Sequence, residues 1–185
     1  MRRFFVRLIL LSIFVGGLIW VGLPWYRMFS AYQQLKNEAL PSSVQVPVQG
    51  LERRRVVDTW GAARSQGRTH EGTDLFAKRG TPVLSATRGI VTRLTENNLG
   101  GTVLYVMGPG GYQHYYAHLE RYGAFKAGDW VKPGDVLGFV GNSGNAKGTP
   151  PHLHYGLYTP DWQAVNPYPL LARAPIQQPT RTQEN

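Results

Sequence analysis

Between about residue 51 and residue 160, short runs of β-branched and aromatic residues alternate with turns that contain glycine. Runs of this length and composition predict strands, and no convincing amphipathic helix interrupts them. The candidate strands cover residues 82–86, 89–94, 102–107, 112–118, 136–140 and 152–158. We therefore expect one mostly β domain, which we place at residues 51–171.

All five histidines of the chain lie between residues 70 and 154, and the chain has no cysteine. Four of them fall within three short motifs, His70-Glu71-Gly72-Thr73-Asp74, Tyr116-Ala117-His118-Leu119 and His152-Leu153-His154. The lack of cysteine excludes disulfides and thiolate metal ligands. The clustering predicts a single metal-dependent site built from imidazole and carboxylate groups.

The spacing of these residues allows their side chains to converge. His152 and His154 are two residues apart in a predicted strand, so they share one face of it. His70 and Asp74 are four apart, and the glycine between them disfavours a helix, so an extended or looped segment again allows both onto one side. Two imidazoles and one carboxylate with an open fourth position are typical of catalytic zinc.

The remaining histidines are candidates for proton transfer. If His70, Asp74 and His154 are the three ligands, His118 and His152 are left to move protons or to stabilise a developing oxyanion. A zinc ion in such a site lowers the pKa of bound water towards about 7 and polarises a carbonyl group. Together these parts are what an amide hydrolase requires.

Two further residues near the motifs need an interpretation. His114 would share a face with His118 on a regular strand; we interpret it as a structural histidine, and lining of the cleft is the alternative. Glu71 follows His70 on an extended segment, so we expect it to point away from the site and do not assign it as a general base.

At these motifs the sequence resembles the M23 family of zinc metallopeptidases, of the lysostaphin and LytM type. The likeness covers about residues 50–160 and is strongest at residues 67–74, 116–119 and 152–154, with further likeness at 127–135 and 138–144. The family hydrolyses peptide bonds in the stem peptides or cross-bridges of bacterial peptidoglycan. The resemblance therefore implies a zinc endopeptidase of cell-wall remodelling.

The same resemblance implies a fold and a set of roles. The fold would be a compact antiparallel β-sheet domain with the site in a groove between loops. Zn²⁺ would be bound by His70, Asp74 and His154, and His118 and His152 would be the catalytic histidines. Peptidoglycan would be the partner.

Two other functions share part of this pattern. Some relatives that have lost ligands activate cell-wall amidases, so a non-catalytic, groove-binding activator or scaffold of other cell-wall hydrolases is the alternative. This chain keeps every matching position, which favours the enzyme. A phosphocarrier or biotinyl-type β domain would share the Gly-Asp pattern of residues 128–135 but leaves His70 and Asp74 unexplained.

The amino terminus predicts a membrane anchor at residues 1–27. Arg2, Arg3 and Arg7 precede an apolar stretch that continues to Arg27 and in which Ser12 is the only clearly polar residue. Such a stretch spans roughly 29 Å as a helix, close to the ~30 Å hydrocarbon core of a bilayer. The early arginines favour the cytoplasmic side. We expect a single-pass protein of the cytoplasmic (inner) membrane with its catalytic domain on the outer, periplasmic side.

The alternative for the amino terminus is a cleaved secretory signal, which the absence of a small-x-small cleavage site disfavours. Residues 28–50 are expected to form a short helical stalk and an extended linker, and residues 172–185, rich in Pro, Gln, Thr and Arg, a disordered tail. The formal net charge of +9 favours anionic surroundings such as lipid headgroups or wall polymers. Because the arginines are scattered, we expect no nucleic-acid partner.

Overall fold

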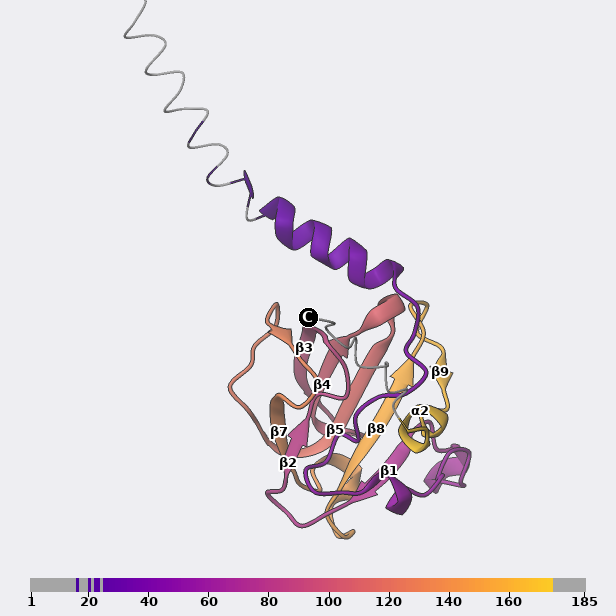
Figure 1. The fold of residues 1–185 in the computed structure, drawn as a ribbon. Coiled ribbons are helices and arrows are strands. Elements are labelled where there is room, and N and C mark those ends of the chain that lie inside the picture. Colours follow the sequence, from indigo (N-terminus) through magenta and orange to yellow (C-terminus); the bar gives the residue numbers. More distant parts are fainter. Residues whose placement is uncertain (1–15, 17–19, 21, 24, 175–185) are drawn as a thin grey trace, which may run out of the picture.

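The computed structural model describes residues 16, 20, 22, 23 and 25–174, and over these residues the fold is a curled, nine-stranded antiparallel sheet (Figure 1). The strands are β1 (Thr73–Phe76), β2 (Pro82–Leu84), β3 (Gly89–Asn97), β4 (Gly101–Met107), β5 (Gln113–Tyr122), β6 (Trp130–Val131), β7 (Val136–Val140), β8 (His152–Tyr158) and β9 (Ala164–Val165). The short helix α2 (Tyr168–Ala172) follows them, and four 3-10 turns, η1 (Arg53–Arg55), η2 (Ser65–Gly67), η3 (Pro109–Gly111) and η4 (Gly144–Ala146), lie in loops.

The hydrogen-bonded strands follow the order β1-β8-β5-β4-β3-β6, with β7 pairing both β2 and β5, and β9 pairing β8. The six strands expected from the sequence are present as β2, β3, β4, β5, β7 and β8, which confirms the expectation of a mostly β domain. Strands β1, β6 and β9 were not expected. They have only two to four residues each, too few for a side-chain alternation to be recognised.

The hydrophobic core lies on one face of the sheet and contains residues from every long strand. Leu104, Tyr116, Leu137, Leu153 and Tyr155 are all fully buried in it. Nearly all of the residues in the middle of β5 and β8 are buried, and both strands are paired on both sides within the sheet. This packing makes the central strands a rigid base for side chains on the opposite face.

The segment expected as a linker packs into this core. Val44, Val46 and Val48 are buried, and Val48 forms an isolated bridge with Val83 of β2. The backbone of this segment is extended, as expected, but its valines alternate inward as in a strand. The packed unit therefore begins before residue 51.

A helical segment at residues 25–37 precedes the sheet and projects away from it (Figure 1). Its last turn contacts the domain, because Leu35 is fully buried and Glu38 pairs with Arg88. Among the described residues there is no helix with both the length and the apolar character needed to cross a bilayer. Most of the expected anchor at residues 1–27 and most of the expected tail at 172–185 lie outside the described residues.

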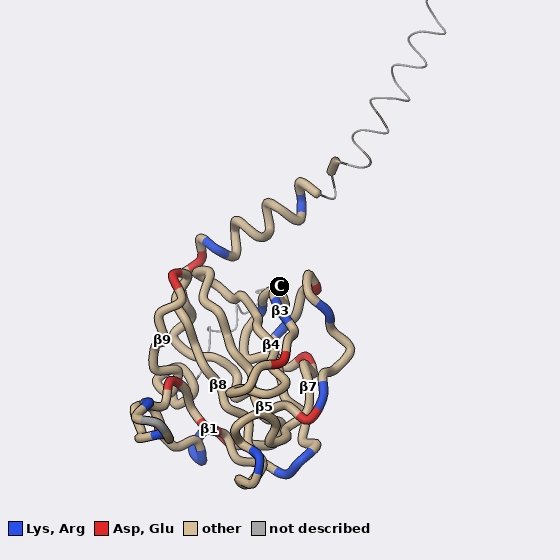
Figure 2. The backbone as a smooth tube through the Cα atoms, turned by 180° about the vertical axis from the view of Figure 1, so that it is seen from behind, with Lys and Arg blue, Asp and Glu red and all other residues tan. Residues whose placement is uncertain are grey.

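Lysines and arginines are spread over several loops and strands (Figure 2). The consecutive arginines of η1 do not all have the same surroundings. The Arg53 guanidinium donates hydrogen bonds to the carbonyl oxygens of Leu170 and Leu171 in α2 and of Val44, whereas Arg54 is exposed. Arg53 thus ties α2 to the segment at residues 44–48.

Candidate metal centre and active-site groove

Strand pairing places two of the predicted ligands side by side. Asp74 of β1 lies opposite His154 of β8, and His154 lies opposite Ala117 of β5. Residues paired across antiparallel strands point to the same face. This face is opposite the one that buries Leu153 and Tyr155, so the alternation of β8 separates its histidines from the core.

The third predicted ligand, His70, lies in the loop before β1, and backbone hydrogen bonds hold that loop in place. The amide of His70 donates to the carbonyl oxygen of Ala62 at 2.9 Å, and the amide of Gly61 donates to that of His70 at 2.9 Å. The ring Nδ1 of His70 lies 2.6 Å from the carbonyl oxygen of Thr59. Since a carbonyl oxygen only accepts, Nδ1 carries the proton and Nε2 presents a lone pair.

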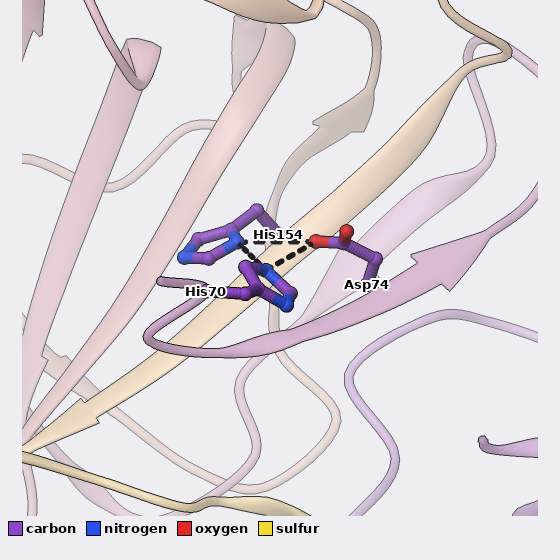
Figure 3. A group of neighbouring side chains, drawn as sticks. All are labelled: His70, Asp74 and His154. Carbon is purple, nitrogen blue, oxygen red and sulfur yellow. Dashed lines mark hydrogen bonds and ion pairs between the residues drawn. The ribbon is translucent and has the colours of Figure 1, made fainter. Parts of the chain in front are cut away.

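The three side chains meet at one point (Figure 3). His70 Nε2 lies 2.8 Å from His154 Nδ1 and 3.0 Å from Asp74 Oδ1. His154 Nδ1 lies 3.1 Å from the same carboxylate oxygen. Residues from a loop, β1 and β8, up to 84 positions apart in the sequence, therefore converge as the spacing argument expected.

The chemistry of these donors fits a metal ion. A proton on His154 Nδ1 can form a good hydrogen bond to His70 Nε2 or to Asp74 Oδ1, but not to both. A cation placed between the three atoms can contact all of them at once. The separations of 2.8 to 3.1 Å are close to the roughly 3.4 Å expected between donors about 2.1 Å from tetrahedral zinc. A small outward movement would bring the group to that geometry.

Asp74 has a second partner that the sequence did not indicate. Its Oδ2 accepts a hydrogen bond from the Arg64 guanidinium at 2.6 Å, and its backbone amide donates to Thr59 Oγ1 at 3.0 Å. Burial alone would raise the pKa of Asp74, but hydrogen bonds with His154 and His70 outweigh it and hold the pKa well below its usual range. The carboxylate is therefore ionised and oriented at both oxygens.

A close approach of two segments requires glycine at position 72. A Cβ added there would lie 2.5 Å from His154 Cε1 and 2.8 Å from the carbonyl oxygen of Tyr155. Only glycine lets the His70 loop lie directly against β8. The glycine that argued against a helix thus serves to seat the loop on the ligand histidine.

His118 reaches the groove because its strand is irregular. The pairing of β5 with β4 shifts register between Thr102 and Leu104, and His118 has a φ of 61°, which is rare for a residue with a side chain. On a regular strand His118 would share a face with His114. β5 is not regular, and the bulge turns His118 to the opposite face, so the two histidines do not share one.

The ring of His118 is anchored by the loop at residues 143–149. Its Nδ1 lies 2.9 Å from the carbonyl oxygen of Ser143, so Nδ1 carries the proton and Nε2 is free. The Ser143 hydroxyl donates to the carbonyl oxygen of Leu119 and accepts from the amide of Thr102. Burial, followed by the neighbouring imidazoles of His154 and His152, lowers the pKa of His118 to about 4.

His152 is anchored in the same way. Its Nδ1 lies 2.8 Å from the carbonyl oxygen of Pro150, and its Nε2 lies 4.0 Å from Asp74 Oδ1. The ring centroids of His118 and His152 are 5.0 Å apart. Two imidazoles, each with its Nδ1 bonded to a backbone carbonyl oxygen, therefore stand beside the ligand group.

His114 lies in the core. It is fully buried, its Nδ1 lies 2.6 Å from the Tyr155 hydroxyl, and burial lowers its pKa to about 3. It does not line the groove.

An open groove with a volume of about 750 Å³ passes over the ligand group. Its floor is formed by β1, β5 and β8, and its walls are the loops at residues 64–71, 99–100 and 145–150. Glu71 is exposed and lines this groove, so the expectation that it points away is wrong, although no hydrogen bond or ion pair connects it to the ligands among the described residues.

Fold and site together define a class: a curled β-sheet protein with a candidate one-metal site in the floor of an open groove. The family model for peptidase family M23 matches residues 68–167, more than half of the chain, and the chain belongs to this family.

Curated relatives share the region of the sheet. The chain is 43% identical over 125 residues to the L-Ala--D-Glu endopeptidase of Bacillus subtilis strain 168, covering 61% of this chain and 38% of that protein. It is 36% identical over 110 residues to the peptidoglycan DD-endopeptidase ShyC of Vibrio cholerae, covering 57% of this chain and 25% of that protein. The match thus spans less than half of each relative's length.

Solved structures show the same fold. The catalytic domain of lysostaphin from Staphylococcus simulans superposes with a TM-score of 0.59 at 28% identity, covering 65% of this chain and 96% of that domain. A glycyl-glycine endopeptidase LytM-like structure from Ruminococcus gnavus gives a TM-score of 0.58 at 34% identity, covering 76% of this chain and 61% of that one. The expected lysostaphin and LytM type of fold is confirmed.

Proposed function

We propose that this protein is a zinc-dependent endopeptidase that hydrolyses peptide bonds in the stem peptides or cross-bridges of peptidoglycan. The observation that carries the proposal is the convergence of His70 Nε2, Asp74 Oδ1 and His154 Nδ1 within about 3 Å. Family membership and the endopeptidase names of the relatives support the reaction class.

His70, Asp74 and His154 are the proposed zinc ligands. When bound, zinc supplies Lewis-acid chemistry by lowering the pKa of water and polarising the scissile carbonyl group. The Thr59 carbonyl oxygen keeps His70 in the tautomer that exposes Nε2, and Arg64 fixes the plane of the Asp74 carboxylate. Such contacts behind the ligands strengthen metal sites.

His118 and His152 are the proposed catalytic histidines. Each has an anchored Nδ1–H and an Nε2 lone pair beside the ligand group, so each can accept a proton at Nε2. One takes the proton of the attacking water, and the resulting imidazolium delivers it to the departing amine. The other takes a proton from solvent at Nε2 before the reaction, donates a hydrogen bond to the carbonyl oxygen as negative charge develops there, and keeps that proton through the cycle.

The shape of the groove suits a polymer. It is open along its length, and its walls are loops, so a cross-linked chain can lie across the ligand group without threading through a tunnel. A small soluble substrate would not need such access.

The test is to incubate the full chain with purified peptidoglycan and zinc and to identify the released fragments by mass spectrometry. We expect fragments cut within the peptide part, abolished by a chelator and restored by zinc. His154→Ala should be inactive, whereas Lys126→Ala, in a distant turn, should match the wild type. A zinc-binding wild-type protein that releases nothing would refute the peptidase and favour the activator or scaffold.

We further propose that residues 1–27 anchor the protein in the cytoplasmic membrane with the sheet domain on the periplasmic side. Support comes from the apolar amino-terminal sequence and from the exposed Trp20, Trp25, Tyr26 and Phe29 in the described helical residues beside it. Protease added to spheroplasts should digest the domain. Protection of the domain until lysis would place it inside the cell and contradict the orientation.

A further inference from the structure

Four aromatic rings lie in mutual contact on the groove side of the sheet, one of them buried, two partly buried and one exposed, and the proposed proton transfers use none of them. We call them the aromatic platform: Tyr105 of β4, Tyr115 of β5, Tyr158 of β8 and Trp162 of the turn after it. The ring centroids of Tyr105 lie 4.8 Å from Tyr115 and 5.8 Å from Trp162. Those of Tyr158 lie 6.0 Å from Tyr115 and 6.2 Å from Trp162.

The platform is continuous with the candidate metal centre. Tyr115 lies two residues before Ala117, the residue opposite His154, so it occupies the next position on the same face, about 7 Å along the strand. Its ring centroid lies 5.8 Å from that of His154. Tyr115 and Tyr158 also line the groove. A molecule bound over the ligands can therefore extend onto the platform.

The outer ring is not explained by packing alone. Trp162 is 52% exposed and has a φ of 64°. A bulky residue in this left-handed conformation is strained, and such strain is characteristic of functional sites. The amides of Trp162 and Gln163 donate to the carbonyl and hydroxyl oxygens of Thr159, so the turn holds the indole in place.

The position of the platform limits what it can bind. β4, β5 and β8 are paired on both sides, so their backbone groups are not available for an added peptide strand. What remains is the exposed indole of Trp162 beside the partly buried rings of Tyr105 and Tyr158, with the Arg93 guanidinium over the Tyr105 ring at 5.8 Å from its centroid. A pyranose ring has the matching shape, with an apolar C–H face and a polar edge.

We infer that the aromatic platform binds a sugar ring of the glycan strand to which the cleaved peptide is attached. The choice of this saccharide rests on the proposed peptidoglycan substrate, while the platform itself is defined by the geometry above. Sugar binding beside the ligand group would favour peptides still joined to glycan over peptides already released from it.

A binding experiment tests the platform independently of cleavage. The full chain, in a detergent without a sugar headgroup, is titrated with a tetramer of β-1,4-linked N-acetylglucosamine by calorimetry. Trp162→Gly removes the indole and suits the positive φ, so the turn is kept. We expect about tenfold weaker binding, the scale of a strong aromatic contact. Trp130→Ala, at an exposed tryptophan of β6, is the matched control and should bind as the wild type does.

A second experiment uses cleavage. The rate on glycan-bearing peptidoglycan is divided by the rate on cross-linked peptides freed from glycan. Trp162→Gly and Tyr105→Leu should lower this ratio about tenfold, and Trp130→Ala should leave it unchanged. Thermal unfolding of each variant confirms that the fold is kept.

The outcomes separate the two proposals. A wild-type protein that binds the tetramer through Trp162 but cuts neither substrate would refute the peptidase and keep the platform. Cleavage of both substrates with no tetramer binding, or with a ratio unchanged in both variants, would overturn the platform. The platform proposal would also be overturned if Trp162 contributed more to the binding of the glycan-free peptide than to the binding of the tetramer.

Discussion

Neighbouring residues of the same strands serve opposite faces of the sheet. In β8, Leu153 and Tyr155 are fully buried in the core, whereas His152 and His154 face the groove. In β5, His114 is buried with the core while His118, after the bulge, lines the groove. The regular alternation of β8 thus places residues that stabilise the fold on the core face and candidate site residues on the groove face. In β5, one backbone irregularity moves His118 from the core face to the groove face.

The largest effect is expected when a proposed zinc ligand on the groove face is removed. His154→Ala removes one of three donors and should lower the catalytic rate at least about a thousandfold, because metal catalysis contributes several kcal/mol. Bound zinc, measured by elemental analysis, should fall with it. The neighbouring core change Leu153→Ala should instead lower the free energy of unfolding by about 2–5 kcal/mol and leave zinc in the folded fraction. Equal zinc loss in both variants would contradict the separation of faces.

The next effect tests the bulge. His118→Ala should lower kcat about a hundredfold to a thousandfold, since it removes a proposed proton carrier, while zinc content stays at the wild-type level. The measurement is steady-state kinetics on a cross-linked peptide together with metal analysis. If kcat were unchanged, the bulge would merely accommodate a residue that takes no part in catalysis.

A smaller effect is expected behind the ligands. Arg64→Ala removes the 2.6 Å hydrogen bond to Asp74 Oδ2 and should weaken zinc binding about tenfold to a hundredfold, the usual cost of losing such a partner. Competition with a fluorescent chelator measures the affinity. Arg68→Ala, at a nearby groove arginine without a bond to Asp74, is the control. A loss equal to that of Arg64→Ala would indicate a general charge effect.

The smallest effect concerns His114, the buried histidine on the core face, and the dependence of stability on pH. Burial lowers the pKa of His114 to about 3, below the value of about 6.5 for an exposed histidine. Between these values the unfolded chain binds a proton that the folded protein does not, so stability falls as the pH is lowered from about 6.5 towards 3. The contribution is about 1.4 kcal/mol per pH unit.

Urea unfolding at several pH values measures this slope. His114→Gln removes the titrating group and should reduce the dependence of the unfolding free energy on pH by that amount. A variant with the wild-type slope would show that His114 does not titrate on unfolding, and that the core histidine is not the source of the acid sensitivity.

The sequence predicted most of the sheet, and the five residues that it singled out, His70, Asp74, His118, His152 and His154, all line the groove. Six strands were foreseen because the runs of β-branched and aromatic residues that contain them are five or more residues long in the sequence. The paired histidines of β8 were foreseen because they are two residues apart in such a run. Arg64 was missed, since it lies in a loop with no periodicity and its bond to Asp74 joins residues whose proximity depends on the loop path. Thr59 and the packed valines of residues 44–48 were missed on similar grounds.

By itself, the sequence determined which residue types were available for the site and that the two histidines of β8 share one face, because alternation is a local property of an extended backbone. Only the tertiary structure decided that β1 pairs with β8 so that Asp74 lies opposite His154, that the His70 loop packs against β8 at Gly72, and that a bulge turns His118 into the groove. These features depend on strand register, loop closure and a local backbone irregularity. Each is settled by contacts between residues far apart in the chain, which no short motif records.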